Sequence, residues 1–240
     1  MKRLPVFTLL LFPIALCAQQ QVIHVPDGGA RERLQSIDIL PKPGAPFSAT
    51  VVTEWTRLLE DGTTTTVKNH RTIARDSVGR IFQERRYLMP NGDTQVTPLS
   101  SIEYADPIRH EFFNCLPNTH VCTVTPYNRP ATFQMAAAGV LPNGSITREN
   151  MAEKRVENLD LEGSREITTI NAGVNGYQRP EPTIKEFWYS PRLEINIITK
   201  RFEPRGGAQS IVVNNVNLDN PDAKLFVPPA GYIILRQRPE

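Results

Sequence analysis

The stretch that decides the fold is residues 47–56, which read FSATVVTEWT. Phe47, Ala49, Val51, Thr53 and Trp55 fall on one face of an extended chain, and the residues between them fall on the other. A period of two is typical of a half-buried β-strand, whereas an amphipathic helix repeats every 3.6 residues. The stretch therefore predicts a strand with one face toward a core.

Turn signals after this strand predict more strands. Asp61-Gly62 is a strong two-residue hairpin signal, and residues 76–79 and 90–93 read as further turns. Three long strands joined by tight turns form an antiparallel meander. Further strands are expected at 101–104, 111–115, 121–125, 155–161, 164–170, 183–190, 194–202 and 210–218, with Glu162-Gly163 as a hairpin turn.

The predicted fold is all-β with minor helix: a curved antiparallel sheet, or half-barrel, built from about nine to eleven strands in meanders. One domain is expected over residues 47–235, after a linker or arm at 19–46 in which Ile37 and Ile39 are spaced for one short strand. A loop excursion is expected near 127–150, with a short helix around 132–138. Residues 219–222 are expected to cap one helical turn that leads to Phe226.

The N-terminus has the pattern of a secretory signal peptide over residues 1–18. A short basic start precedes an apolar run from Leu4 to Leu16, and cleavage is expected after Ala18. The run is shorter than the ~20 apolar residues of a membrane span, and no transmembrane segment is expected in the mature chain. The protein is therefore predicted to be secreted or periplasmic. A lipoprotein anchored at Cys17 is the alternative, which the bulky Leu16 disfavours.

Charge argues against a nucleic-acid partner. The chain has 27 basic and 25 acidic residues, and two of the basic residues lie in the signal peptide. The mature chain would carry no net charge, whereas nucleic-acid binders carry a basic stripe. Five arginines lie among three glutamates between residues 54 and 86, and such charges are more often cross-strand pairs on a solvated face than an anion site. The residues are Arg57, Arg71, Arg75, Arg85 and Arg86, with Glu54, Glu60 and Glu84.

Two cysteines would remain after cleavage, Cys115 and Cys122, and an even pair in an oxidising compartment predicts a disulfide. A metal site made with His110 and His120 does not match the ligand spacing of structural zinc. His110-Glu111 is one substitution short of the zinc-protease motif, because Asn114 stands where its second histidine is required. No catalytic residue, metal or cofactor is therefore predicted.

Large aromatic side chains in strands are the candidates for ligand binding. The residues are Trp55, Phe112, Phe187, Trp188 and Tyr189. Aromatics on both faces of the strand at 186–190 fit a core on one side and a covering loop on the other. They also fit a concave sheet that binds an apolar ligand.

Several segments resemble a family of uncharacterised secreted proteins common in acidobacterial genomes. They are Ala45–Ala49, Arg75–Arg80, Glu186–Pro191 and Leu225–Tyr232, within a match over about residues 37–235. The layout is also similar to the half-barrel of periplasmic lipoprotein carriers and sigma-factor regulators. This resemblance implies an apolar concave face covered by a helix or loop, although no long lid helix is evident here.

The first hypothesis is a non-enzymatic envelope protein that binds an apolar or lipid-like ligand, or a protein partner, on a concave sheet. The alternatives are a hydrolase with an unrecognised polar or metal site at His110 and Glu111, and a purely structural component of the envelope.

Overall fold

A computed structural model describes residues 37–59, 61–128, 137–176 and 178–236. These residues form thirteen strands and two short 3-10 helices, which confirms the all-β prediction and exceeds the predicted nine to eleven strands. The strands are β1 (Phe47–Leu58), β2 (Thr64–Arg75), β3 (Ile81–Arg86), β4 (Leu99–Asp106), β5 (Glu111–Leu116), β6 (Val121–Pro126), β7 (Gly139–Leu141), β8 (Gly144–Val156), β9 (Leu159–Ile170), β10 (Glu181–Ser190), β11 (Ile195–Glu203), β12 (Gly207–Asn217) and β13 (Ile233–Arg236). The 3-10 helices are η1 (Val174–Gly176) and η2 (Ala223–Phe226).

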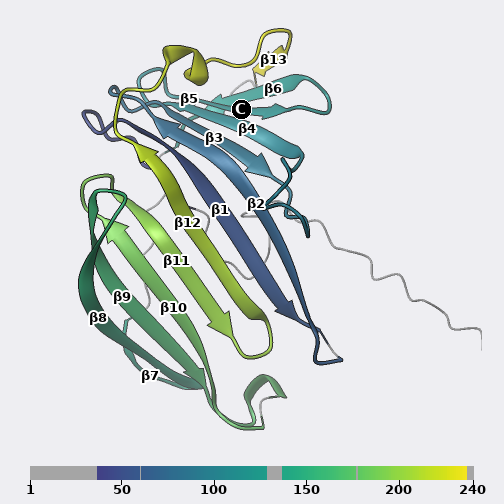
Figure 1. Ribbon diagram of the computed structural model, residues 1–240, viewed down its shortest axis with the longest axis vertical. Coiled ribbons are helices and arrows are strands. Elements are labelled where there is room, and N and C mark those ends of the chain that lie inside the picture. Colours follow the sequence, from purple (N-terminus) through teal and green to yellow (C-terminus); the bar gives the residue numbers. More distant parts are fainter. Residues whose placement is uncertain (1–36, 60, 129–136, 177, 237–240) are drawn as a thin grey trace, which may run out of the picture.

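All thirteen strands belong to one curved sheet that does not close on itself (Figure 1). The order is β13-β6-β5-β4-β3-β2-β1-β12-β11-β10-β9-β8-β7, so β1 pairs with β12 at the centre and joins an early meander to a late one. Every pairing is antiparallel except β13 with β6, which is parallel and was not predicted. The predicted curved antiparallel sheet is confirmed. No helix in the described part of the chain is long and apolar enough to cross a membrane.

One predicted hairpin turn was wrong. The turn between β8 and β9 is Glu157-Asn158, with φ angles of 52° and 60°, and Glu162-Gly163 lies inside β9. Two central residues with positive φ fit a type I′ hairpin. Gly163 serves close packing instead, because a Cβ at this position would lie 2.6 Å from Cζ3 of Trp188.

Strands occupy the second half of the predicted excursion near 127–150. β7 and β8 form a hairpin there, while residues 129–136, which hold most of the predicted helix, lie outside the described residues. The predicted helical turn before Phe226 is confirmed as η2, whose Asp222 carboxylate accepts a hydrogen bond from the Lys224 amide. The short strand expected at Ile37 and Ile39 is absent, since residues 37–46 belong to no strand.

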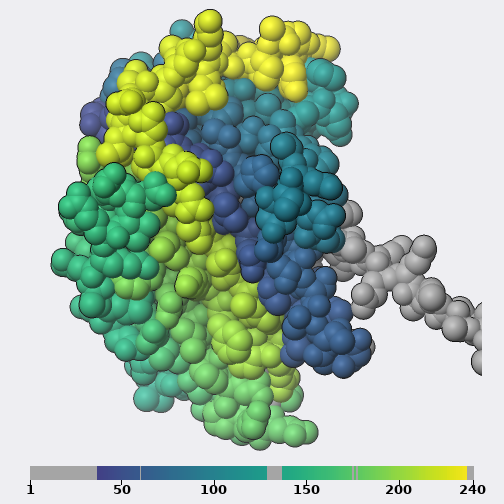
Figure 2. Space-filling view, viewed as in Figure 1, coloured from purple at the N-terminus to yellow at the C-terminus, as the bar shows by residue number. Residues whose placement is uncertain are grey.

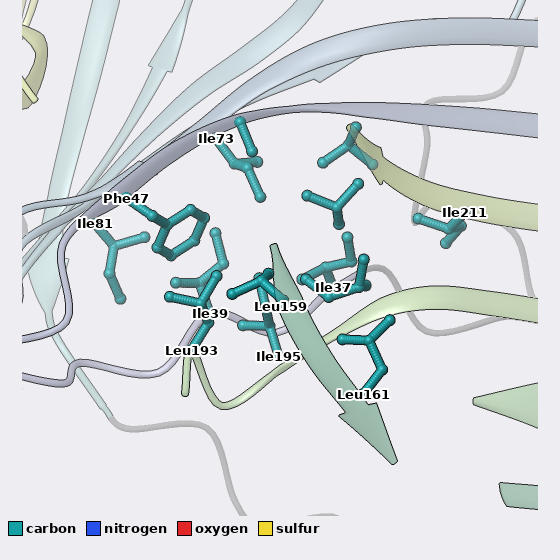
Figure 3. Close-up of a cluster of buried hydrophobic side chains, with 14 of the residues drawn as sticks. Ile37, Ile39, Phe47, Ile73, Ile81, Leu159, Leu161, Leu193, Ile195 and Ile211 are labelled. Atoms are coloured by element: carbon teal, nitrogen blue, oxygen red, sulfur yellow. The ribbon is translucent and has the colours of Figure 1, made fainter. Parts of the chain in front are cut away.

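The main core lies on the face of the sheet that carries Phe47, Ala49, Val51, Thr53 and Trp55, called here the core face. Segments outside the central strands complete it. Ile37 and Ile39 come from the arm before β1, and Leu159 and Leu161 come from the β8–β9 hairpin. In Figure 3 Ile39 lies by Phe47 and Leu193, and Ile37 lies by Leu159 and Ile195, all within the one cluster. This part of the concavity is therefore filled by the protein itself.

A smaller cluster covers the opposite face at the β3–β6 end. Phe82, Tyr104 and the two cysteines pack there beneath Phe226 of η2. Figure 2 shows the C-terminal segment, in yellow, lying over this end of the molecule. The two clusters lie on opposite faces because alternate residues of β3, β4 and β5 point to opposite faces of the sheet.

Cys115 and Cys122 are directly opposite each other on β5 and β6 and form the predicted disulfide, with both side chains fully buried. Replacing both by alanine is expected to lower the free energy of unfolding by roughly 2–3 kcal/mol, because the short closed loop no longer restricts the unfolded chain. Urea denaturation of the variant beside the oxidised protein measures this. A difference below about 1 kcal/mol would contradict the expectation.

Candidate functional site

The five predicted ligand-binding aromatics do not meet at one site. Trp55 and Phe187 both face the core side, but two strands, β11 and β12, separate their strands in the sheet. Trp188 pairs with Ile198 next to a β-bulge, and Tyr189 beyond it is 37% exposed. Phe112 lies on β5, far across the sheet.

Trp188 packs where the β8–β9 hairpin bends. Its ring lies against Gly163, and the ammonium group of Lys154 is 3.6 Å from the ring centroid. Desolvation at this position lowers the pKa of Lys154, and the nearby Lys200 lowers it further. β8 also carries a bulge between Met151 and Lys154, and bulges increase the local bend and twist of a strand. The geometry gives Trp188 a packing role in this bend.

Phe112 lines a pocket on the core face, whereas Tyr189 lines a separate pocket formed with residues of β8 and β9. The pocket around Phe112 has a volume of about 270 Å³ and lies where the arm before β1 crosses β3, β4 and β5. Most of its lining side chains are apolar. The lining residues are Ile37, Asp38, Ile39, Ile81, Gln83, Ala105, Phe112, Pro126, Tyr127 and Asn128.

Strand register brings the pocket residues together. Ile81 pairs with Ala105, and Ala105 pairs with Phe112, so these three side chains form one apolar row across β3, β4 and β5. On the arm, Ile37 and Ile39 are buried while Asp38 between them is exposed. Alternation along residues 37–39 was a usable signal for a buried segment, although it did not indicate which part of the sheet the segment covers.

Gln83 and Asp38 line the pocket beside the apolar row, together with the polar side chains of Tyr127 and Asn128. Gln83 donates from Nε2 to Oε2 of Glu103 at 2.6 Å, and its own Oε1 is buried with no hydrogen-bond partner. Since an ionised carboxylate only accepts, this contact fixes which end of the Gln83 amide is the oxygen. Asp38 is exposed at the pocket mouth. The protein around it still desolvates its carboxyl group enough to raise its pKa, against the opposing effect of Arg85.

The arm that forms one wall of the pocket is held by Arg75. This side chain is fully buried and donates from Nε to the carbonyl of Ala45, from Nη1 to that of Leu40 and from Nη2 to that of Leu193, at 2.8–2.9 Å. Burial lowers the pKa of Arg75 to about 10, so the guanidinium stays charged at neutral pH. The guanidinium also lies 5.1 Å from the ring centroid of Phe47.

The placement predicted for two arginines was therefore wrong. Arg71 and Arg75 are 1% and 0% exposed. They lie on the core face because each is two residues from Ile73 in β2 and therefore points to the same side of the sheet. Cross-strand pairs on the other face do match the prediction: the side chains of Glu54 and Lys68 lie 3.2 Å apart. Arg165 and Glu186 pair there in the same way at 2.8 Å.

The residues of the alternative catalytic hypothesis lie at the start of β5. His110 is exposed in the turn before the strand, with a φ of 55°, and the carboxylate of Glu111 accepts a hydrogen bond from Arg236. Within the described ranges, no three His, Cys, Asp or Glu side chains gather as metal ligands would. A hydrolase therefore stays a hypothesis without an assembled site.

No protein-family model and no curated protein matches this chain. Solved structures with a similar layout include an uncharacterized conserved protein from Thermus thermophilus, with 11% identity, a TM-score of 0.40 and coverage of 81% of this chain and 91% of that one. MucB matches with 11% identity and a TM-score of 0.35 over 81% of this chain and 61% of its own. A LolA superfamily protein from Nitrosomonas europaea matches with 8% identity and a TM-score of 0.28 over 78% and 92%.

These structures bear out the predicted similarity of layout to lipoprotein carriers and sigma-factor regulators. The resemblance to acidobacterial secreted proteins finds no support among them.

Proposed function

We propose that this protein is a non-enzymatic protein of the cell envelope that holds an apolar or lipid-like ligand in the pocket around Phe112. The observation that supports the proposal is an apolar pocket on the core face, bounded by the arm and the strand row of Ile81, Ala105 and Phe112. Ligand pockets are predominantly apolar with a few placed polar groups, and they start at roughly 300 Å³. At about 270 Å³ the pocket lies just below this range, which limits it to a small apolar ligand or one chain of a larger lipid.

The proposed ligand site is limited to this pocket because side chains of the protein fill the neighbouring part of the core face. Leu159, Leu161 and Ile37 are each 5% exposed or less and occupy the centre of the core face. A ligand that covered the whole concave sheet would have to displace them. The predicted contribution of Trp55 and Phe187 to ligand binding is thus less direct than that of Phe112, since neither lines this pocket.

Uptake of the apolar dye 1-N-phenylnaphthylamine by the purified protein tests the proposal. Phe112→Ala is expected to weaken dye binding about 5- to 10-fold, which corresponds to about 1–1.4 kcal/mol of lost contact. Ala105→Val is expected to weaken it as well, because the larger side chain points into the same space. Circular dichroism confirms that each variant is folded under the conditions of the titration.

Phe113→Ala is the matched control. Phe113 is the next residue of β5 and also half-buried, but it packs in the cluster on the opposite face. Its truncation should leave the dye affinity within twofold of the unmodified protein. Absence of dye uptake, or an equal loss in both alanine variants, would reject the pocket as the site and favour a purely structural role.

A further inference from the structure

The pocket around Phe112 has an acidic mouth. Asp38 is the one charged side chain among its described lining residues, and no lysine, arginine or histidine is among them. Asp38 forms no ion pair and no side-chain hydrogen bond with any described residue. Its carboxylate is thus exposed beside an apolar row and is open to a partner that enters the pocket.

Among the described residues, Arg85 is the cation that acts on Asp38, and it does not reverse this charge. Arg85 acts on Asp38 only as a nearby charge, because its guanidinium binds Glu103 through Nε and Nη2, each at 3.1 Å from Oε2. Arg85 and Glu103 neutralise each other, so among the described residues Asp38 leaves a net negative charge at the pocket mouth.

The deeper polar atom also requires a donor. Oε1 of Gln83 is buried without a hydrogen-bond partner, and the amide is held in this orientation by Glu103. A buried acceptor without a donor is unfavourable and is usually satisfied by water or by a ligand. Two of the polar groups that line the pocket, the Asp38 carboxylate and Gln83 Oε1, therefore call for a donor, while Tyr127 and Asn128 complete its polar lining.

We infer that the ligand of this pocket is a cationic amphiphile: an apolar chain against Phe112 and Ala105, with an ammonium or similar donor head at Asp38 and Gln83. The inference rests on the proposed function and specifies the class of ligand. An ammonium group supplies positive charge and three donors, whereas a fatty-acid carboxylate would bring a second negative charge and no donor. A neutral alcohol can donate one hydrogen bond but is not attracted by the negative charge of the Asp38 carboxylate.

Competition with bound 1-N-phenylnaphthylamine by three ligands of equal chain length tests the inference. The ligands are dodecylamine, dodecanol and dodecanoate, each kept below its micelle concentration at pH 7.5. Dodecylamine is expected to displace the dye at a concentration at least tenfold lower than dodecanoate, with dodecanol between them. Asp38→Asn should weaken dodecylamine about tenfold and leave dodecanol within twofold.

Glu149→Gln is the matched control, because it removes one exposed carboxylate on a distant strand, β8. It should change none of the three affinities. Equal or tighter binding of dodecanoate would overturn the inference and leave the proposed function standing, as would an amine preference that persists in Asp38→Asn. Failure of all three alkyl ligands together with the dye would instead reject the proposed function itself.

Discussion

Replacing Arg75 by methionine is expected to lower the free energy of unfolding by about 3–5 kcal/mol. Methionine has a similar length and cannot donate to the carbonyls of Leu40, Ala45 and Leu193. Each buried carbonyl that loses its donor costs about 1–3 kcal/mol, and partial relaxation of the arm recovers some of this. The arm and the β10–β11 turn would both lose their common attachment to β2.

Urea denaturation measures this loss, and Arg192→Met is its matched control. Arg192 lies in the same β10–β11 turn and is exposed, so its replacement should change the stability by less than about 0.5 kcal/mol. Arg75→Lys should recover little, since an ammonium group cannot reach three carbonyls in the planar arrangement of a guanidinium. A stability of Arg75→Met within about 1 kcal/mol of the unmodified protein would show that the three hydrogen bonds are not needed to hold the arm.

Local sequence patterns predicted the strands because side chains alternate between the two faces of a sheet every two residues and short turns join neighbouring strands. The alternation of residues 47–56 and the turn at Asp61-Gly62 were sufficient for β1 and β2. Glu157-Asn158 was missed because glutamate rarely adopts positive φ, whereas Gly163 looked like a turn residue. The glycine is instead required by contact with Trp188, a residue 25 positions away in the sequence, and no local pattern reports such a contact.

The candidate site depended more strongly on contacts that sequence patterns do not report. Phe112 was identified from its type, but its partners on the arm are over 70 residues earlier in the chain. Arg75 is two residues from Ile73 in β2, so the period of two placed it on the core face. Its charge nevertheless favoured the interpretation that the side chain is exposed to solvent. Burial of the Arg75 charge is tolerated because its guanidinium donates hydrogen bonds to three carbonyls, which lie 30, 35 and 118 residues away in the sequence.

The β8–β9 hairpin explains why the concave sheet leaves only a limited pocket. It extends past the end of β10, and a hydrogen bond from the Val216 amide to the Glu157 carboxylate joins its tip to β12. Leu159 and Leu161, just after the turn, are each 1% exposed within the main core cluster. The hairpin thus fills part of the core face.

Shortening a buried side chain of this hairpin should therefore change both the stability of the protein and the amount of apolar ligand that it binds. Leu159→Ala is expected to lower the free energy of unfolding by about 2–5 kcal/mol, because a fully buried leucine leaves a cavity that the sheet cannot close completely. Asp160→Ala is the matched control. The Asp160 side chain is next to Leu159 in the sequence, is 86% exposed and lies 3.9 Å from Arg155, and such an exposed ion pair contributes little to stability. Urea denaturation should separate the two variants clearly.

If the pocket binds the dye as proposed, an apolar cavity in the core cluster that Leu159 shares with Ile37 and Ile39 should also increase dye uptake, since such cavities stay dry and accept apolar guests. Titration of Leu159→Ala with 1-N-phenylnaphthylamine is therefore expected to show a higher bound fluorescence than the unmodified protein or Asp160→Ala. Lower stability without added uptake would mean that the hairpin collapses into the space. Unchanged stability would contradict its role in filling the sheet, because burial of Leu159 is the contact through which the hairpin fills the core face.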